Sequence, residues 1–523
     1  MKLFTVEQIR QGDAYTIANE PVSSSGLMER AAGKAATWIS NHYPAPTRFK
    51  IFAGTGNNGG DGLVIARLLA GQEYNVEVFI ARLGSHESDD FTNNLHNLNS
   101  IKTIPVHELS EQGELPQIDS ETIIIDSLFG SGLTKPLQGF AAGLVQHLNN
   151  SISEIISIDM PSGLFGEDNS NNERDHIIKA TFTLTFQFPK LAFFFSENEK
   201  YTGKWYVLPV DIHPEYIEST PSKYYYLSEE DILPLLKPRR KFAHKKNFGH
   251  ALIVAGSYGK MGAAVLSSRA CLKTGVGLLT AHVPSFGYEI IQSTVPEAMA
   301  SIDIYNKVIT NIPLNENFNA IGIGPGIGKS QKTQEALKDL FHNTRVPLVI
   351  DADAINIVAD NKEWINKIVS DCIFTPHPKE FERLSGVSKD SYTRLQLQVD
   401  FAVKYNLILV VKGAYTSITT PDGTCFFNST GNPGMATGGS GDVLTGMILS
   451  LVAQGYSAVE SALLGVYLHG LAGDIASAEL GEESVTAGDI VDYISNAYIY
   501  LKKRKYSKNR QEISPVSLSE SHP

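Results

Sequence analysis

The chain has 523 residues, of which 42% are hydrophobic and 19% are charged, which excludes a single small domain and a disordered protein. The formal net charge is −12, whereas nucleic-acid-binding proteins are usually basic, so we expect small-molecule or protein partners. Three cysteines without CxxC spacing, and a first segment without an apolar core, predict a cytoplasmic protein. The apolar stretches are interrupted by polar residues such as Gln454, so we expect no membrane span.

The first part of the chain alternates between strand and helix patterns. Residues 28–43 are rich in alanine and amphipathic, which predicts a helix, and a short strand is predicted at 48–54. A helix at 61–70 and a strand at 75–81 follow. Further strands are predicted within 121–130, 153–163, 180–188 and 203–210. Such alternation predicts an α/β domain, residues 1–224, in which helices cover both faces of a parallel sheet.

Near residue 225 the pattern starts again. Ser228 and Asp231 form a capping box, and strands are predicted within 250–256, 275–283, 320–328, 346–354, 372–377 and 407–414. Long helices are predicted at 441–453 and 459–479. We therefore expect a second α/β domain at 225–505 and a polar, disordered tail at 506–523.

A glycine-rich segment, "FAGTGNNGGDG", follows the strand at 48–54. Its glycines at 54, 56 and 59 have the spacing of a dinucleotide fingerprint, with backbone N–H groups that bind phosphate. The fingerprint alone is weak, because the next strand ends at Arg82 where an acidic residue would bind ribose. Asn57 and Asn58 could instead serve only the turn geometry.

Two other strand ends carry carboxylates. Asp126 in "IDSLFGSG" and Asp159 in "SIDMPSG" follow predicted parallel strands, at the edge where ligands bind in open α/β sheets. Asp126, Asn58 and Ser162 could form an all-oxygen cluster, which favours a monovalent or weakly held hard cation over zinc. Alternatively, both carboxylates cap the turns that follow them.

In the second domain the segment "GNPGMATGGSGDVLTGMI" places glycines before an apolar helix. Backbone N–H groups at such a helix start form a phosphate or oxyanion hole, and Asp442 could deprotonate an attacking hydroxyl there. Alternatively, Asp442 only complements the helix N-terminus. His377 in "TPHPKEF" and Lys412 in "VVKGAYT" also follow strands, and the lysine ammonium could bind phosphate there. Taken alone, His377 is more simply a structural histidine, and Lys412 is more simply a solvated residue at a strand end.

The motifs "LMERAA", "GTGNNGGDGLVIARLL", "IDSLFGSGLTKP", "IDMPSG" and "FPK" resemble the N-terminal domain of the NAD(P)H-hydrate repair enzymes, over about residues 1–220. That domain is a Rossmann-like three-layer sandwich that epimerises the hydrated cofactor NAD(P)HX. The resemblance implies that substrate contacts Asn57, Asn58, Gly59, Gly60, Asp61, Gly130, Ser131, Gly132, Leu133, Thr134, Lys135, Pro136 and Asp159. It implies a potassium ion at Asn58, Asp126 and Ser162, and Asp159 is the candidate catalytic acid or base.

The second half resembles the NAD(P)HX dehydratase branch of the ribokinase-like superfamily, also a three-layer sandwich, through "IGPGIG", "IDADAINIV", "TPHPKEF", "VVKGA" and "NPGMATGGSGDVLTGMI". The resemblance implies that Ala263, Gly326, His377 and Asp442 bind the hydrate, with Asp442 catalytic. It implies that nucleotide contacts Lys412, Gly413, Ala414, Tyr415, Thr416 and Gly441. Lys246 stands where this branch often has a glycine, which affects no assigned residue.

Together these motifs predict a bifunctional metabolite-repair enzyme that acts on NADHX and NADPHX. The expected phosphate donor is ADP, with ATP as the alternative, accompanied by Mg²⁺, and the expected resident ion is K⁺. A homo-oligomer is expected. Two other hypotheses stay open at this point: a ribokinase-like small-molecule kinase, and an N-terminal half that binds NAD for regulation without catalysis.

Overall fold

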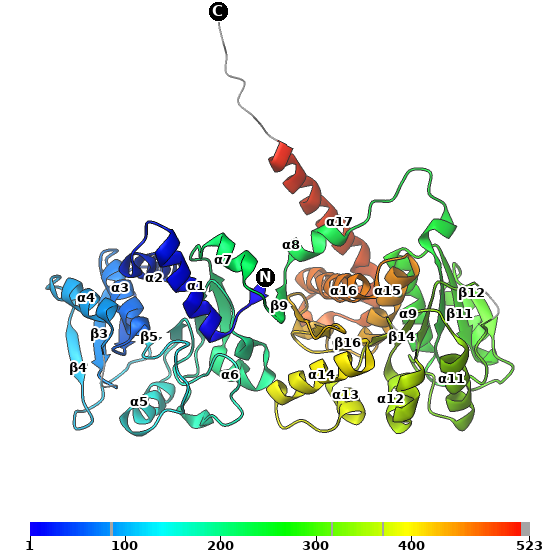
Figure 1. The fold of residues 1–523 in the computed structure, drawn as a ribbon, viewed down its shortest axis with the longest axis horizontal. Helices are drawn as coiled ribbons and strands as arrows, with labels where there is room; N and C mark the ends of the chain where they lie inside the picture. Colours follow the sequence, from blue (N-terminus) through cyan, green and yellow to red (C-terminus); the bar gives the residue numbers. More distant parts are fainter. Residues whose placement is uncertain (84–86, 315–316, 369–370, 514–523) are drawn as a thin grey trace, which may run out of the picture. The chain divides into compact units, whose positions relative to one another are not determined.

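A computed structural model describes residues 1–83, 87–314, 317–368 and 371–513, and it divides into two compact units. The N-terminal unit comprises Lys2–Ser222 with Asp390–Thr393, and the remainder forms the C-terminal unit. Figure 1 shows that each unit is built around a sheet flanked by helices. Within the described part of the chain, every helix is too short or too polar to cross a bilayer.

The N-terminal unit alternates strands with helices along the chain. Its strands are β1 Lys2–Leu3, β2 Arg48–Ala53, β3 Asn75–Ala81, β4 Val106–Leu109, β5 Thr122–Ser127, β6 Ile155–Ile158, β7 Phe182–Phe186 and β8 Lys204–Leu208. Its helices are α1 Val6–Asn19, α2 Ser24–His42, α3 Asn57–Ala70, α4 Asp89–Asn99, α5 Gly139–Asn149, α6 Glu199–Thr202 and α7 Pro214–Ser219.

The N-terminal sheet runs β4-β3-β2-β5-β6-β7-β8, and all of these neighbours pair in parallel. Side chains alternate between its faces: Ile51 packs with α2 and α3, whereas Phe52 packs with α5. Because both faces are covered, the strands read as continuous apolar runs. The predicted three-layer α/β sandwich is confirmed.

The C-terminal unit repeats this scheme with longer helices. Its strands are β9 Tyr224–Leu227, β10 His250–Val254, β11 Leu278–Val283, β12 Met299–Ile302, β13 Ala320–Ile323, β14 Leu348–Ile350, β15 Ile373–Phe374, β16 Ile408–Val411, β17 Ser417–Thr419 and β18 Cys425–Asn428. Its helices are α8 Glu229–Ile232, α9 Met261–Thr274, α10 Tyr288–Thr294, α11 Gln331–Asn343, α12 Ala352–Asp360, α13 Pro378–Ser385, α14 Ser391–Tyr405, α15 Ser440–Ala453, α16 Ala458–Leu480 and α17 Ala487–Ile513.

The C-terminal sheet runs β9-β18-β17-β16-β15-β14-β13-β10-β11-β12. From β16 to β12 its neighbours pair in parallel, whereas β17 pairs antiparallel with both β16 and β18. Ile253 packs toward α9, α15 and α16, and Leu252 packs toward α11, α12 and α13, which gives three layers here as well. The carboxyl ends of β10 to β16 therefore share one edge, where ligands of open α/β sheets bind.

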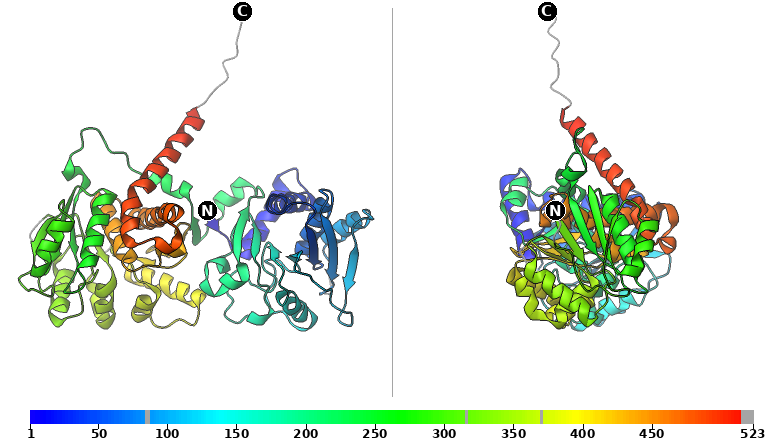
Figure 2. Two further views of the ribbon diagram at one scale, coloured as in Figure 1. Left: turned by 180° about the vertical axis from the view of Figure 1, so that it is seen from behind. Right: turned by 90° about the vertical axis from the view of Figure 1, so that its right-hand side faces the viewer.

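The sequence prediction of a disordered tail from residue 506 is wrong in part. Helix α17 continues to Ile513, and both views in Figure 2 show its last turns extending beyond the layers of the C-terminal unit. Arg504 donates to Glu229 at 3.0 Å, and the Lys505 ammonium donates to the Leu236 carbonyl at 2.9 Å. Lysine, arginine, glutamine and glutamate are good helix formers, so a polar composition did not exclude a helix. Residues 514–523 lie outside the described residues.

All three cysteines lie in the interior of the C-terminal unit. Cys271, Cys372 and Cys425 are free and buried. Burial raises the pKa of the Cys372 and Cys425 thiols to about 12, and it raises the pKa of Cys271 as well. These side chains therefore remain protonated thiols and pack as small apolar groups.

Candidate active sites

The glycine-rich segment of the N-terminal unit packs tightly against the end of β5. A β-carbon at Gly54 would lie 2.1 Å from the Leu128 carbonyl oxygen, and one at Gly59 would lie 1.8 Å from the Gly54 carbonyl oxygen. Only glycine permits such close backbone contact. Helix α3 begins at Asn57 rather than at the predicted residue 61, so residues 57–60 form its first turn. The N-terminal turn of α3 thus presents its backbone N–H groups at the carboxyl edge of the sheet.

Asp126 and Ser162 are brought together at this edge, where the predicted strand ends allowed them to converge. The Ser162 hydroxyl donates to Asp126 Oδ1 at 2.5 Å, and the Ser162 N–H donates to Oδ2 at 2.9 Å. Ser157 donates to Oδ2 at 2.7 Å. Burial raises the pKa of Asp126, and these hydrogen bonds oppose that rise by stabilising the carboxylate. The group is therefore a fixed, buried cluster of oxygen atoms.

Asn58 lies next to Gly130 and Asp159, and its amide has no protein partner in the described part of the chain. Among the described residues, Asn58 Oδ1 and Nδ2 belong to the buried polar atoms that have no hydrogen-bond partner. Gly130 lies between Asn58 and Asp159. A β-carbon at Gly130 would lie 3.3 Å from Asn58 Cγ and 3.3 Å from Asp159 Oδ2. Buried amides are rarely left unpaired, so the Asn58 carbonyl oxygen without a partner is suited to ligate a cation.

Asp159 lies beside this cluster in an uncommon backbone conformation. Its φ is +63°, in the left-handed region that non-glycine residues seldom adopt and that often marks functional positions. The Ser131 N–H donates to Asp159 Oδ2 at 3.2 Å, and the Lys190 ammonium forms an ion pair with Oδ1. Lys190 is fully buried and also donates to Thr185 Oγ1 at 2.6 Å. Sequence reasoning assigned no role to this lysine, although it is the last residue of the "FPK" motif.

Two further carboxyl groups face the same charge cluster. Burial first, and then the charge of Asp159, raise the pKa of Asp13 to about 6. Burial and the charges of Asp159 and Asp13 raise the pKa of Asp61 well above its usual range. Asp13, on α1, was missed by the sequence analysis, because one acidic residue on a helix gives no signal without its neighbours. The cluster therefore combines one buried lysine with two carboxyls, Asp13 and Asp61, that favour protonation.

The predicted substrate loop 130–136 divides into two parts. Gly130 and Ser131 contact the cluster, and a β-carbon at Gly132 would lie 2.6 Å from Arg10 Nη2. Leu133 packs against the core beneath α5, whereas Thr134 and Lys135 are exposed and Pro136 is half-buried. The structure thus groups the first residues of this loop with the site.

In the C-terminal unit, α15 begins beside the predicted hydrate site. Its N-cap, Gly439, has a φ of +93°, and Ser440, Gly441 and Asp442 form the first turn. The N–H groups of this turn lack helical acceptors, which suits them to bind phosphate oxygens. Burial and the charge of Asp351 raise the pKa of Asp442 to about 6, while Lys412 opposes that rise. Asp442 is therefore suited to accept a proton near neutral pH.

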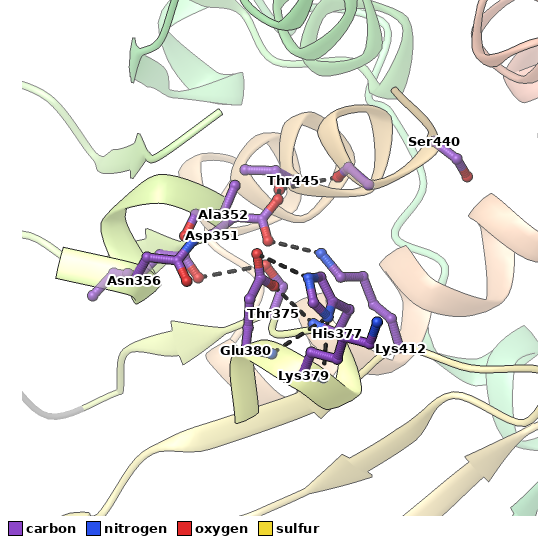
Figure 3. A network of polar contacts seen from close by, with 12 residues as sticks. Asp351, Ala352, Asn356, Thr375, His377, Lys379, Glu380, Lys412, Ser440 and Thr445 are labelled. Atoms are coloured by element: carbon purple, nitrogen blue, oxygen red, sulfur yellow. Dashed lines mark hydrogen bonds and ion pairs between the residues drawn. The ribbon is translucent and has the colours of Figure 1, made fainter. Parts of the chain in front are cut away.

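Lys412 lies within an ordered polar network, and the interpretation as a solvated strand end is wrong. Its ammonium donates to Asp351 Oδ1 at 2.8 Å, and Thr445 donates to Asp351 Oδ2 at 2.7 Å (Figure 3). A β-carbon at Gly441 would lie 3.2 Å from Lys412 Nζ. Asp351 follows β14 and is fully buried. The network therefore fixes a lysine ammonium directly beside the first turn of α15.

His377 has a structural role at the start of α13. Its Nδ1 accepts from the Lys379 N–H at 3.1 Å and the Glu380 N–H at 3.3 Å, and the Glu380 carboxylate accepts from the His377 N–H at 2.9 Å (Figure 3). This capping box places the ring proton on Nε2, which lies 3.4 Å from Glu380 Oε1. His377 is thus held in one tautomer by the start of α13.

A cavity of about 390 Å³ joins several predicted residues at this edge. It is lined by Gly259, Lys260, Gly262, Ala263, Gly326, Ala352, Asp353, Asn356, Glu380 and Asp442. Gly326 has a φ of +64°, and a β-carbon there would lie 3.2 Å from Ala263 Cβ. Lys260 donates to Asp353 at 3.1 Å within the lining. Ala263, Gly326 and Asp442, which lie far apart in the sequence, therefore share one cavity.

The segment 413–416 forms a tight turn directly after Lys412. Thr416 Oγ1 accepts from the Gly413 N–H at 3.2 Å and donates to the Gly413 carbonyl at 3.0 Å. Gly413 and Ala414 are exposed, and Tyr415 is half-buried. This turn lies at the carboxyl end of β16, directly after the Lys412 ammonium and on the same sheet edge.

A half-buried histidine that sequence reasoning missed supports the α15 turn. His469, on α16, lies with Nε2 3.0 Å from the Ser440 carbonyl oxygen and 3.3 Å from Ser440 Oγ. Burial lowers the pKa of His469 to about 4. A neutral imidazole therefore donates its Nε2–H to that carbonyl and steadies the residue before Gly441.

Comparison with known proteins covers both halves. The family model described as NAD(P)H-hydrate dehydratase matches residues 251–496, and the one described as YjeF-related protein N-terminus matches residues 24–192. The bifunctional NAD(P)H-hydrate repair enzyme Nnr of Thermofilum pendens is 32% identical over 515 residues, covering 96% of this chain and 97% of that protein. The protein of the same name from Moorella thermoacetica is 33% identical over 514 residues, covering 94% and 96%.

A crystal structure of the ADP/ATP-dependent NAD(P)H-hydrate dehydratase from Bacillus subtilis, co-crystallised with ATP and Mg²⁺, is 30% identical. It has a TM-score of 0.48 and covers 53% of this chain and 98% of that chain. The full-length relatives confirm the resemblance that the motifs predicted in both halves. The chain belongs to the family of bifunctional NAD(P)H-hydrate repair enzymes.

Proposed function

We propose that the chain interconverts the R and S epimers of NAD(P)HX in its N-terminal unit and dehydrates S-NAD(P)HX in its C-terminal unit, with ADP as phosphate donor. The observation that carries the second activity is the position of Asp442. It lines the cavity, stands in the first turn of α15 and lies among the charges of Asp351 and Lys412. A base and an anion hole therefore meet at one end of the cavity.

The chemistry of dehydration explains why a kinase-like site suits this reaction. The hydrate has a hydroxyl on the carbon next to the ring nitrogen, and hydroxide is a poor leaving group. Transfer of the ADP β-phosphoryl group to that oxygen forms an O–P bond and releases AMP. The ring nitrogen lone pair then expels phosphate, and loss of a proton from the neighbouring carbon restores the double bond. The products are NAD(P)H, AMP and inorganic phosphate.

Each charged group has a defined task in this proposal. Asp442 accepts the hydroxyl proton as the oxygen attacks phosphorus. A general base of this kind typically raises the rate about 10²–10⁴-fold. Lys412 and the N–H groups of the α15 turn stabilise the charge on the transferred phosphoryl group. The hydrated ring is positioned by Ala263 and Gly326, which line the cavity. His377 contributes from its place beside Glu380, a lining residue to which its N–H donates.

The nucleotide is proposed to lie along the turn Gly413, Ala414, Tyr415 and Thr416, with Gly441 beneath its phosphates. The placement of this turn immediately after Lys412 supports the proposal. Mg²⁺ is usually held by one or two carboxylates together with substrate phosphates, and the cavity offers Asp353 for this role. When bound, the ion would neutralise phosphate charge. No residue distinguishes ADP from ATP, so the choice of donor rests on likeness to the family.

In the N-terminal unit, Asp159 is the proposed acid or base for epimerisation. Inversion at the hydroxyl-bearing carbon requires proton transfer, and the fixed contacts of Asp159 with Lys190 and Ser131 hold its carboxylate at the sheet edge. The α3 turn from Asn57 to Asp61 and the loop from Gly130 to Pro136 are proposed to bind the substrate around it. Raised pKa values at Asp61 and Asp13 support proton transfer in this cluster.

Potassium is the proposed resident ion of the N-terminal unit. Asn58, Asp126 and Ser162 would hold it, and the orphaned amide of Asn58 supports this assignment. When bound, the ion would supply a fixed positive charge close to substrate phosphate groups. Oxygen ligands with a single carboxylate suit a monovalent ion better than a transition metal.

We also propose a cytoplasmic location, supported by three free and buried thiols that suit a reducing compartment. The substrates would be NADHX and NADPHX, both small molecules that the anion-binding helix starts can accommodate. A homo-oligomeric state remains a prediction from the sequence.

The deciding experiment measures purified S- and R-NADPHX with ADP, with ATP and without nucleotide. We expect NADPH, AMP and free phosphate to form from the S epimer with ADP, and the R epimer to be consumed after epimerisation. A stable phosphorylated product instead of free phosphate would establish a small-molecule kinase. Turnover with ATP and none with ADP would overturn the choice of donor, and a failure to equilibrate R and S would favour a regulatory N-terminal unit.

A further inference from the structure

The substrate cavity of the C-terminal unit is small for a dinucleotide. Its volume of about 390 Å³ lies low in the range of about 300–1,000 Å³ that encloses drug-sized ligands. A hydrated nicotinamide cofactor comprises two joined nucleotides. If the hydrated ring occupies the cavity beside Asp442, the adenosine half must therefore lie outside it, along the protein surface.

A cluster of aromatic and basic side chains borders the cavity on one side. Tyr258 directly precedes the lining residues Gly259 and Lys260, and 66% of its surface is exposed. The Lys307 ammonium lies 4.9 Å from the centre of the Tyr258 ring, and the Phe286 ring centre lies 5.4 Å from it. We call Tyr258, Phe286 and Lys307 the rim cluster. An exposed aromatic ring with a cation over one face matches a purine base, stacked on the other face, with a nearby phosphate.

The rim cluster stands on the ligand edge of the sheet. Its loops follow β10, β11 and β12, which pair in parallel, so their carboxyl ends lie side by side. Figure 1 shows β11 and β12 as neighbouring strands in the C-terminal unit. The proposed nucleotide turn follows β16, on the far side of the cavity strands β13 and β14. The rim cluster therefore borders the cavity on the side away from the phosphate donor.

The loop that carries Lys307 is fixed by a buried carboxylate. Asp303 accepts hydrogen bonds from the Tyr305 N–H at 2.8 Å, the Thr310 N–H at 2.6 Å, the Thr310 hydroxyl at 2.8 Å and the Asn311 N–H at 3.0 Å. Asp303 itself is almost completely buried. A loop held in this way presents its side chains in one arrangement before any ligand binds.

Backbone hydrogen bonds also join the three loops to each other. The Tyr258 N–H donates to the Lys307 carbonyl at 3.1 Å, and the Ser285 N–H donates to the Tyr305 carbonyl at 3.0 Å. The loop of Tyr258 is tied in turn to the cavity, because the Ser257 hydroxyl donates to the Gly326 carbonyl at 2.6 Å. The rim cluster and the cavity lining therefore form one connected surface.

We propose that the rim cluster binds the adenosine half of the hydrated dinucleotide, with adenine stacked on Tyr258 and the 2′-phosphate of NADPHX bound by Lys307. This inference rests on the proposed dehydratase activity and adds its substrate preference. Base–aromatic stacking is worth about 1–3 kcal/mol, which corresponds to a change of roughly 5- to 150-fold in affinity. Contact with the 2′-phosphate makes NADPHX the preferred substrate over NADHX.

The test compares KM for S-NADPHX and S-NADHX in the full-length enzyme at saturating ADP. Tyr258→Ala should raise KM for both substrates about tenfold, while Tyr258→Phe keeps the stacking surface and stays near wild type. Lys307→Ala should raise KM for NADPHX about tenfold and leave KM for NADHX within twofold. Lys338→Ala, which removes an exposed lysine from α11, is the matched control and should change neither value.

Equal effects of Lys307→Ala on the two substrates, or unchanged KM values in Tyr258→Ala, would overturn the inference while leaving the dehydratase activity intact. A second measurement does not depend on turnover: calorimetric binding of adenosine 2′,5′-bisphosphate at saturating ADP should weaken about tenfold in Lys307→Ala. If the wild type failed to dehydrate either hydrate yet showed this binding difference, the proposed function would be wrong and the adenosine site would stand. Identical binding to wild type and Lys307→Ala would refute the site.

Discussion

The Lys412 ammonium lies 2.8 Å from the buried carboxylate of Asp351, and this ion pair joins the carboxyl ends of β16 and β14. Thr445 on α15 donates to the other oxygen of the same carboxylate at 2.7 Å. The strand that carries Lys412, the proposed phosphate-binding cation, is therefore bonded through one aspartate to α15, which carries the proposed anion hole and base. Changes at any of the three groups should affect both stability and catalysis.

Lys412→Met should destabilise the C-terminal unit and abolish dehydration. Removing one partner of a buried pair leaves an uncompensated charge at Asp351, which typically costs about 3–5 kcal/mol in the free energy of unfolding. The double variant Lys412→Met/Asp351→Asn should regain most of that stability and none of the dehydratase activity, because the ammonium is still missing. Urea unfolding and NADPH formation measure the two effects, and substantial activity in the double variant would remove Lys412 from the mechanism.

Dehydration should depend on the ionisation of Asp442. Its pKa is raised to about 6, and only the carboxylate can accept the hydroxyl proton. The value of kcat/KM should therefore fall about tenfold for each pH unit below 6 and level off above it. Asp442→Asn should reduce turnover by orders of magnitude while nucleotide still binds. Near-normal turnover in that variant would leave Asp442 as a residue that complements the helix N-terminus.

The same substitution should make the folded protein more stable above pH 6. A carboxyl whose pKa is raised from 3.8 to about 6 on folding binds protons more tightly in the native state. Its charged form therefore lowers stability at pH 8, and this effect disappears as the pH falls toward 4. We expect Asp442→Asn to raise the unfolding free energy by about 1–3 kcal/mol at pH 8 and by little at pH 4. A difference between variant and wild type that does not change with pH would contradict the raised pKa.

Epimerisation should require the carboxylate of Asp159. Asp159→Asn is preferable to alanine, because it keeps an oxygen acceptor beside the buried Lys190 ammonium. We expect this variant to lose equilibration of R- and S-NADPHX and to dehydrate pure S-NADPHX at the wild-type rate. The distribution of the two epimers over time is the measurement. Equilibration at the wild-type rate would reduce Asp159 to a structural residue.

Potassium should support epimerisation better than sodium at equal ionic strength. Asn58→Leu and Asp126→Asn should each weaken this response, because they remove a proposed ligand or its charge. Asn97→Ala serves as a control, because it changes an exposed side chain of α4 that has no proposed role in binding substrate or ion. An Asp126→Asn protein with the wild-type potassium response would exclude Asp126 from the ion site.

The sequence predicted most of the parallel strands, and the strand ends that carry the candidate site residues, because both depend on local patterns. Ile51 and its neighbours form a continuous apolar run, which a strand buried on both faces requires, and Asp126 follows such a run. Asp351 also follows one, so the same rule could have identified it. The β17 and β18 pairing was not predicted, since it depends on antiparallel partners that short apolar segments do not specify.

Other site residues could not be found from local patterns. Lys190 reads as a solvated lysine until the fold places it against Asp159, which lies 31 positions away in the chain. His469 lies in the middle of a long helix and acquires its role only where α16 meets the start of α15. Such groups depend on tertiary contacts, and their altered pKa values appear only once burial and neighbouring charges are known.

The position of the three thiols allows unfolding of the C-terminal unit to be measured by alkylation. Cys271, Cys372 and Cys425 all lie in the C-terminal unit, and their protonated state makes them poor nucleophiles while that unit remains folded. An alkylating reagent can modify them only after the surrounding core opens. The rate of alkylation therefore reports the opening of the C-terminal unit alone. The N-terminal unit contributes no signal, so ligand protection of the dehydratase half can be followed in the intact chain without any added label.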